Sequence, residues 1–269
     1  MEPSAKAFAM DQQRKKIHET ITDESSSALQ RYRRVVLGPG GFLALIKYEI
    51  ISSLFGPFPG VVGLALRRIF FPQILGEVGR NPIFGRNIVI RHGQKIRLGD
   101  RVVIDDNVVL DAKGSDNQGI TIGEDSFISR NCILSCKGGS IRIGCNVSLG
   151  VNGLIHAEQG SDVSIGDNSS IGAFTYFVGG GNYRSDRLDI PIKEQGTYSK
   201  GGVVIGPGAW VGSHVQVLDG VKVGQNSMLG AGSVVNGEVP DYAVVAGVPG
   251  KIIKFRLDTA LRTAEGTGR

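Results

Sequence analysis

The chain has 269 residues, 40 of them glycine, with 41% hydrophobic residues and a net charge of +5 at neutral pH. This length allows one or two domains with a sizeable core, and so much glycine among so many apolar residues predicts tight corners between short strands instead of disorder. The positive charge suits an acidic partner such as a phosphate-rich cofactor or an anionic membrane face. The basic residues are scattered and no stripe of stacking aromatics accompanies them, which argues against nucleic-acid binding.

The three cysteines, Cys132, Cys136 and Cys145, form no CxxC pair and have no histidine close to them in the sequence. This pattern argues against a zinc site and favours half-buried thiols in a reducing cytosol. The N-terminus is polar and charged, without the early apolar run of a signal peptide. We therefore expect a cytoplasmic protein that binds no metal.

The first segment, residues 1–41, is polar, with alternating charges before a serine run at residues 25–27. A segment of this composition buries little apolar surface, so we expect a loose arm that contains some helix. The histidine of this arm, His18, is expected to be exposed and without a role.

The next segment, residues 42–77, consists of two apolar runs that flank a Gly-Pro-Phe-Pro-Gly turn at residues 56–60. Its uncharged part is at the short limit for crossing a bilayer, and the central prolines would break a single spanning helix. We expect two short apolar helices joined by a turn. Two roles are open: a cap on the exposed end of a stacked β structure, or a foot formed by residues 42–75 that dips into the inner membrane face, with Arg67 and Arg68 at the headgroups.

From residue 78 onward, an apolar residue returns every six positions in groups of three. The spacings between successive groups are 8, 12, 9, 10, 28 and 6, so every insertion follows the third member of a group. This phase-locking indicates triangular coils of three short strands, with all insertions leaving from one corner. The groups are Val78, Phe84, Ile90; Leu98, Ile104, Leu110; Ile122, Ile128, Leu134; Ile143, Leu149, Ile155; Ile165, Ile171, Phe177; Ile205, Val211, Val217; and Val223, Leu229, Val235.

The residue four positions after each opening apolar residue is often small or β-branched, and we expect it to point inward as well. These residues are Val102, Val108, Ser126, Cys132, Val147, Ser169, Thr175, Ala209, Val215, Ser227 and Ser233. Glycine or an acidic residue often follows the opening residue, which suits turns because glycine tolerates a positive φ. The sequence therefore predicts an all-β solenoid of about seven coils over residues 78–240, with a long loop at 178–204, an N-terminal helical extension, and a C-terminal strand and tail at 241–269.

Two segments carry the clearest motifs: residues 205–212 (Ile-Gly-Pro-Gly-Ala-Trp-Val-Gly) and residues 229–235 (Leu-Gly-Ala-Gly-Ser-Val-Val). Together with the closing segment 244–254, they resemble the hexapeptide-repeat acyltransferases. This resemblance implies a left-handed parallel β-helix, a homotrimer, and acetyl-CoA as an acyl donor held between neighbouring prisms. The section from residue 189 to residue 210 looks like the branch of that family that O-acetylates sugars, antibiotics or polysaccharide precursors.

The same resemblance implies which residues border the arm of CoA. They are Trp210, Gly212, Ser213, Ala231, Gly232, Ser233 and Lys251. For Trp210, a second role is equally open, namely packing at the base of the long loop.

The loop at 178–204 is the candidate active site, because a long loop in a regular scaffold is usually functional. Acyl transfer to a hydroxyl needs a base, donors for the developing oxyanion and fixed reactants, and the backbone amides of Gly179 to Gly181 are candidate donors. In the family, a histidine just after such a glycine run is the base. Here Asn182 and Tyr183 occupy that place, and neither is a good base at neutral pH.

Three other routes to a base are open. His156 is predicted on the coil next to the loop mouth, although an exposed histidine without a task fits its position too. Asp186 or Asp189 would act only if desolvated, and Tyr183 only if a neighbouring cation lowered its pKa. We therefore expect an acyl-CoA-dependent O-acyltransferase for a sugar or a glycan precursor, at the cytoplasmic membrane face if the foot is real. The alternative is a catalytically inactive hexapeptide-repeat trimer that serves as a scaffold or regulator.

Overall fold

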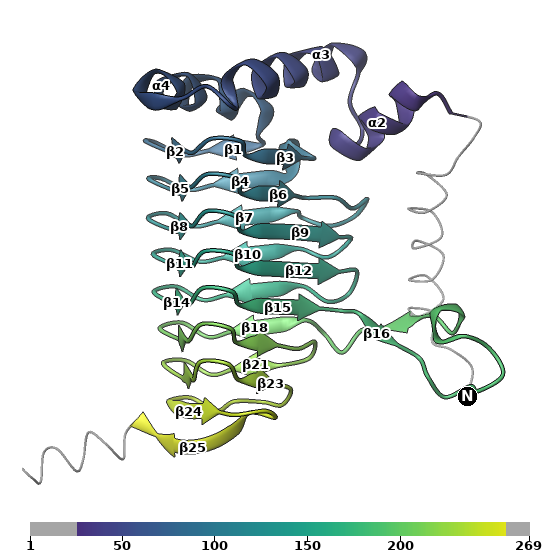
Figure 1. The fold of residues 1–269 in the computed structure, drawn as a ribbon, viewed down its shortest axis with the longest axis vertical. Helices are drawn as coiled ribbons and strands as arrows, with labels where there is room; N and C mark the ends of the chain where they lie inside the picture. The colour runs from purple at the N-terminus through teal and green to yellow at the C-terminus, as the bar shows by residue number, and fades with distance from the viewer. Residues whose placement is uncertain (1–25, 257–269) are drawn as a thin grey trace, which may run out of the picture.

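The computed structural model describes residues 26–256, which form a parallel β-solenoid with a layer of helices across its N-terminal end (Figure 1). Three sheets, named A, B and C, form the sides of a triangular prism, and the chain passes through them in that order on every coil. Seven coils are complete, and an eighth begins where Val239 bridges to Val223 and the next strand joins sheet B. The predicted β-helix with an N-terminal helical segment is confirmed.

The strands are short, as a six-residue repeat requires. Sheet A consists of β1 (Glu77–Val78), β4 (Ile96–Leu98), β7 (Ile120–Ile122), β10 (Ile141–Ile143), β13 (Val163–Ile165), β18 (Val203–Ile205) and β21 (Lys222–Val223). Sheet B consists of β2 (Ile83–Phe84), β5 (Val103–Ile104), β8 (Phe127–Ile128), β11 (Ser148–Leu149), β14 (Ser170–Ile171), β19 (Trp210–Val211), β22 (Met228–Leu229), β24 (Ala243–Ala246) and the antiparallel β25 (Lys251–Phe255). Sheet C consists of β3 (Val89–Arg91), β6 (Val109–Asp111), β9 (Ile133–Lys137), β12 (Leu154–Glu158), β15 (Tyr176–Gly179), β20 (Gln216–Val217) and β23 (Val234–Val235).

The core is one continuous column of stacked side chains along the inside of the prism. Each opening apolar residue except the half-buried Val78 is buried, and so is every small residue four positions later that was predicted to point inward. Identical positions of successive coils pair in register, as Ile104 does with Ile128. Each coil therefore buries its apolar positions by stacking on the next, which is the stabilising principle of solenoids.

The glycine that follows the opening residue has a different role from the expected one. A Cβ on Gly123 would lie only 2.6 Å from the backbone nitrogen of Cys145 on the next coil, so this position needs glycine because two backbones approach each other closely. The positive φ instead occurs two residues further along, at residues such as Asn131 (φ 61°) and Asn152 (φ 57°). Asparagine tolerates this left-handed conformation better than most residues.

The helices cover the N-terminal end of the prism. They are α2 (Ala28–Val36), α3 (Phe42–Ile50), the π-helical continuation η1 (Ile51–Phe55), α4 (Gly60–Phe70) and the short η2 (Phe71–Ile74). Two apolar helices joined by a turn were predicted here, and α3 with η1 and α4 are that hairpin. Its inner side reaches the core through Tyr48 and Ile51, and the following η2 does so through Phe71.

Arg67 does not lie at the outside of the hairpin as the foot hypothesis expects. Its side chain is 2% exposed. The guanidinium donates hydrogen bonds to the carbonyl oxygens of Phe84 (2.9 Å) on the first coil and Phe58 (2.7 Å) in the turn. The expectation that Arg67 meets headgroups is therefore wrong, because this cation ties the hairpin to the prism.

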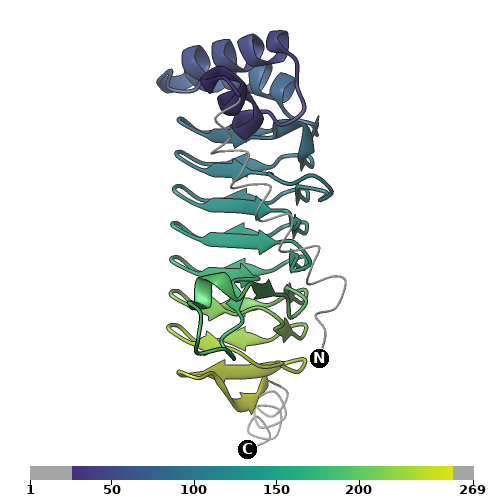
Figure 2. The ribbon, with the colours of Figure 1, turned by 90° about the vertical axis from the view of Figure 1, so that its right-hand side faces the viewer.

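The long loop leaves the corner between sheets C and A and projects from the side of the prism (Figures 1 and 2). Its neck is an antiparallel pair, β16 (Asn182–Tyr183) with β17 (Thr197–Tyr198), and its outer part contains the single turn η4 (Ile192–Glu194). A smaller turn, η3 (Gly93–Lys95), occupies the same corner on the first coil. The predicted exit of insertions after the third strand of a coil is thus confirmed.

Candidate active site

His156 lies on the outer face of sheet C at the mouth of the long loop. On β12 it pairs in register with Ser135 on one side and with Val178 of β15 on the other. Residues 154, 156 and 158 of this strand point outward while 155 and 157 fill the core. The imidazole is 14% exposed, which is enclosed for an outward-facing side chain.

Glu158 is the partner of this histidine and was missed by sequence reasoning. Its Oε1 lies 3.5 Å from His156 Nε2, and its Oε2 accepts a hydrogen bond of 3.0 Å from the backbone amide of Gly181. The interaction with His156, aided by this amide, lowers the pKa of Glu158 to about 2 in spite of its partial burial. The signal that could have found it is the two-residue period of a strand, which places Glu158 on the same face as His156.

This pair has the chemistry of a base held by a carboxylate. An ionised Glu158 favours the tautomer that carries a proton on Nε2 of His156, which leaves Nδ1 as the proton acceptor. The same negative charge stabilises the imidazolium that forms when a proton is taken. Because the backbone amide of Gly181 donates to Glu158, it does not serve as a donor to an oxyanion in this arrangement.

Asn182 fixes the neck of the loop. Its side-chain Nδ2 donates a hydrogen bond of 2.6 Å to Oδ2 of Asp219, a residue that is 6% exposed. The same carboxylate accepts bonds from the backbone amides of Lys200 (2.7 Å) and Gly202 (2.8 Å) at the other end of the loop. Asp219 was not predicted as a site residue, and it lies 37 positions from Asn182 in the sequence.

The three other candidate bases lie further out. Tyr183 pairs with Thr197 in the neck and is 37% exposed. Asp186 is exposed beyond the neck, so the desolvation that it would need in order to act as a base is absent. Asp189 is engaged by the guanidinium of Arg187, which lowers the pKa of this carboxyl.

Five of the seven residues expected to border CoA lie at a different corner of the prism, between sheets B and C. Gly212 and Ser213 follow β19 there, and the residues 231–233 follow β22 one coil further on. Ser233 is fully buried and its hydroxyl donates to the carbonyl of Gly230, so this residue is not available at the surface. Lys251 is exposed at the start of β25.

Trp210 is 46% exposed on the outer face of sheet B, between Ser170 and Met228 of the neighbouring strands. The long loop leaves from the opposite corner, which does not support a packing role at the base of the loop. Within one chain, the His156 corner and the Trp210 face are separate. A site that contains both must therefore be built between two chains.

Comparison with known proteins agrees with the repeat seen in the strands. The family described as "Bacterial transferase hexapeptide (six repeats)" matches residues 202–237, which contain strands of all three sheets. Over these residues the chain is similar to the hexapeptide-repeat bacterial transferases.

Two relatives of this chain are named as acetyltransferases. "Probable acetyltransferase Rv3034c" of Mycobacterium tuberculosis is 38% identical over 137 residues, which cover 51% of this chain and 44% of the relative. The galactoside O-acetyltransferase of Escherichia coli is 33% identical over 135 residues, which cover 50% of this chain and 63% of the relative. The matches therefore span about half to two thirds of the length of these relatives.

Among solved structures, an N-acyltransferase from Bacillus cereus, AntD, is similar to this chain at 19% identity and a TM-score of 0.49, over 76% of this chain and 97% of that one. Within residues 26–256, no group of three histidine, cysteine or acidic side chains is placed to hold a metal ion. The helices of this same region are all too short or too polar to cross a membrane.

Proposed function

We propose that this chain is an acyl-CoA-dependent O-acyltransferase that acetylates a hydroxyl group of a sugar or a glycan precursor. The observation that carries the proposal is the His156–Glu158 pair at the mouth of the long loop, on a hexapeptide-repeat scaffold. The names of the relatives support it, because both are acetyltransferases and one is named for a galactoside. Because the matches cover only part of these relatives, the sugar acceptor is itself proposed here.

The residues of the chain have separate roles in this reaction. Acetyl-CoA, when bound, supplies the acetyl group as a thioester. His156 takes the proton of the acceptor hydroxyl as its oxygen attacks, and later gives that proton to the departing thiolate. Glu158 holds the imidazole and balances its positive charge, while the Asn182–Asp219 bond fixes the loop so that the acceptor is positioned against the base.

The B–C corner fits the arm of CoA. A Cβ at Gly232 would meet nothing within 4 Å, so the surface there is open. The indole of Trp210 offers an exposed flat face to a pantetheine or adenine group, and the exposed ammonium of Lys251 offers a charge to a phosphate. These features support Trp210, Ser213, Ala231, Gly232 and Lys251 as the donor side of the site, whereas Gly212 is buried against the backbone of the next coil.

A homotrimer would bring the two corners together. The outer face of sheet C carries a mostly apolar row in register: Val89, Val109, Ile133, Leu154, Tyr176, Gln216 and Val234. The outer face of sheet A carries a mostly polar row: Glu77, Arg97, Thr121, Arg142, Ser164, Val204 and Lys222. This contrast supports an assembly in which sheet C is covered by a neighbouring prism and sheet A faces water.

The test is release of free thiol from acetyl-CoA by the full-length protein in the presence of a panel of glycosides, with mass spectrometry of the acceptor. We expect one class of sugar hydroxyl to gain an acetyl ester. The second candidate, an inactive scaffold, is favoured by the Asn182–Asp219 bond, since a former base position now holds the loop. CoA binding without turnover of any acceptor would overturn the enzyme proposal in favour of that scaffold.

A further inference from the structure

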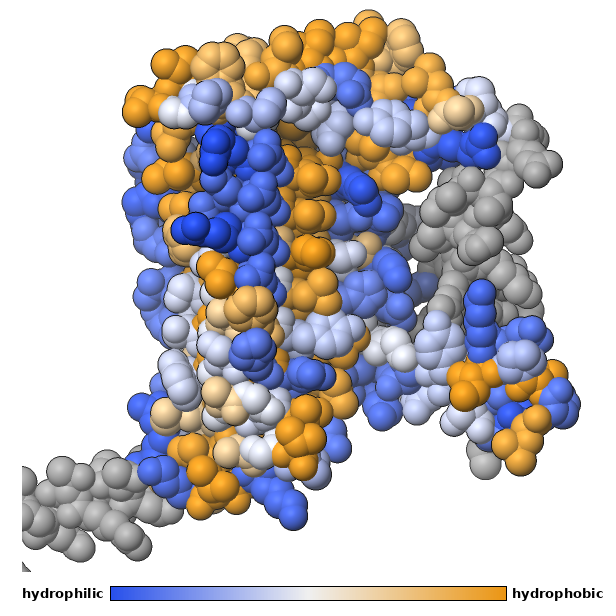
Figure 3. Space-filling model, viewed as in Figure 1, coloured by the Kyte–Doolittle hydropathy of each residue, from blue (hydrophilic) through white to orange (hydrophobic). Residues whose placement is uncertain are grey.

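The outward side of the helical layer is strongly apolar. Figure 3 shows hydrophobic side chains covering the top of the molecule over α3 and α4. Leu43 is 81% exposed and Val61 is 83% exposed. The other large apolar residues exposed on this layer, here called the cap face together with these two, are Phe42, Ile46, Ile50, Leu54, Phe58, Val62, Leu64 and Ile69.

The helices that carry the cap face are anchored to the first coil of the prism. On the inner side of the same helices, Tyr48 is buried and its hydroxyl donates to the carbonyl of Ile90 over 2.8 Å. Arg67 holds the turn and the first coil through backbone carbonyls. The hairpin thus has its own inner side for the core, and the exposed apolar side is an additional surface. Monomeric proteins seldom expose a contiguous apolar surface of this kind without a partner.

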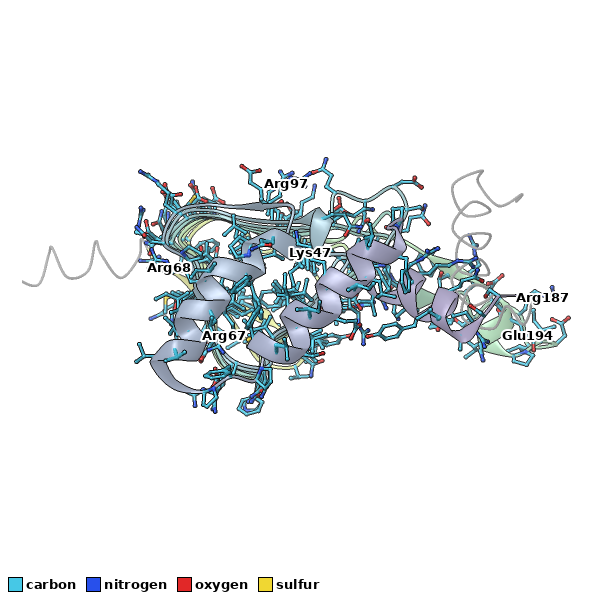
Figure 4. All side chains as sticks on the ribbon, turned by 90° about the horizontal axis from the view of Figure 1, so that it is seen from above. Lys47, Arg67, Arg68, Arg97, Arg187 and Glu194 are labelled. Atoms are coloured by element: carbon cyan, nitrogen blue, oxygen red, sulfur yellow. The ribbon has the colours of Figure 1, made fainter. Side chains whose placement is uncertain are left out.

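The charges around the cap face are mostly positive. Residues 28–71 contain six basic residues, Arg31, Arg33, Arg34, Lys47, Arg67 and Arg68, and one acidic residue, Glu49. Glu49 accepts a hydrogen bond from the hydroxyl of Tyr32, and Arg67 is buried. Lys47 on α3 and Arg68 on α4 are exposed, and Arg68 also donates a hydrogen bond of 2.6 Å to Oδ1 of Asn81; both helices are seen from above in Figure 4. An apolar face beside exposed cations complements an anionic lipid surface.

We propose that the cap face docks this protein on an anionic membrane surface, with α3 and α4 lying in the plane of the interface and the prism pointing away from it. The helices are too short or too polar to cross a bilayer, so the contact is peripheral. A second copy packed against the same face would bring the two sets of cations together, which disfavours that occupant. This docking is independent of the proposed acyltransferase activity.

The experiment is flotation of the full-length protein with vesicles of phosphatidylcholine alone or with phosphatidylglycerol added. The wild type is expected to float with the anionic vesicles, to float less as salt is raised, and to stay largely unbound with the neutral ones. The double variant Leu43→Glu, Val61→Glu is expected to lose about tenfold or more of its vesicle binding. Both glutamates enter the first turn of a helix, where the helix dipole favours a negative charge, so the fold is retained.

The matched control is Ile253→Glu, which places the same charge on an exposed apolar residue at the far end of the solenoid, on β25. It is expected to float like the wild type. Wild-type protein that stays unbound with anionic vesicles, or a double variant that floats as well as the control, would overturn the proposal. Sedimentation that shows a wild-type end-to-end pair dissolved by the double variant would overturn it too, by assigning the cap face to a second copy.

Discussion

The side-chain amide of Asn182 is bonded to the buried carboxylate of Asp219 over 2.6 Å, which joins the first residue of the loop neck to the coil that follows the loop. Asn182 stands at the place where the hexapeptide-repeat acyltransferases would be expected to carry a catalytic histidine. Here the position holds the loop in place. The proton chemistry of the proposed reaction is therefore assigned to His156, which belongs to the coil before the loop.

Replacing Asn182 by alanine is expected to lower the free energy of unfolding by about 1–3 kcal/mol, because a buried carboxylate loses one of its donors. Amide hydrogen exchange in residues 182–204 should accelerate as the neck loosens. The matched control is Gln225→Ala, since Gln225 donates to Asp241 at the exposed surface over 3.1 Å. That variant should change stability by less than about 0.5 kcal/mol. Equal effects of the two substitutions would argue against a special role for the neck.

Glu158 predicts a specific dependence of stability on acid. Its pKa is lowered from 4.5 to about 2 in the folded chain, so the ionised form stabilises the fold above pH 4.5, and this stabilisation is lost as the pH falls toward 2. Glu158→Gln removes this titration. Urea unfolding across this range should show the wild type losing more stability with acid than the variant does. Parallel curves for the two proteins would contradict the His156–Glu158 pairing.

The close approach of the coils predicts a contrast between two glycines. Gly123→Ala places a methyl group 2.6 Å from a backbone nitrogen of the next coil, whereas Gly237→Ala meets nothing within 4 Å. The first substitution is expected to cost roughly 1–3 kcal/mol of stability through overpacking, and the second close to nothing. Thermal unfolding of both variants checks this. A Gly123→Ala protein as stable as the wild type would show that the coils can move apart freely.

The apolar row on sheet C predicts where the chains meet. Ile133→Arg puts a charge in the middle of that row, between Val109 and Leu154, and is expected to dissociate the proposed trimer. Thr121→Arg makes the same change on the polar face of sheet A and should leave the assembly intact. Analytical ultracentrifugation distinguishes the two. A wild-type monomer, or an Ile133→Arg trimer, would contradict the assembly in which two chains share the site.

The sequence was sufficient to predict the stacked coils and the exit of the loop, because a six-residue period directly records which side chains point inward. Ile104 and its neighbours in register are examples. The same period says little about outward contacts between coils, which is why Glu158 and Asp219 were missed. It also gave no warning that Arg67 is buried, since a cation in an apolar run has the same pattern whether it faces lipid or backbone carbonyls. The role of Gly123 was misassigned because the sequence does not reveal how closely the backbones of neighbouring coils approach each other.

The central claim is that His156 is the base of an acyl transfer, and steady-state kinetics of His156→Ala with acetyl-CoA and the best acceptor test it most directly. We predict that kcat falls by at least about 100-fold while KM for acetyl-CoA changes little, because the base acts on the acceptor and not on the binding of the donor. Tyr183→Phe should keep most of its kcat. A His156→Ala enzyme with undiminished kcat, beside a Tyr183→Phe enzyme that has lost it, would contradict the assignment.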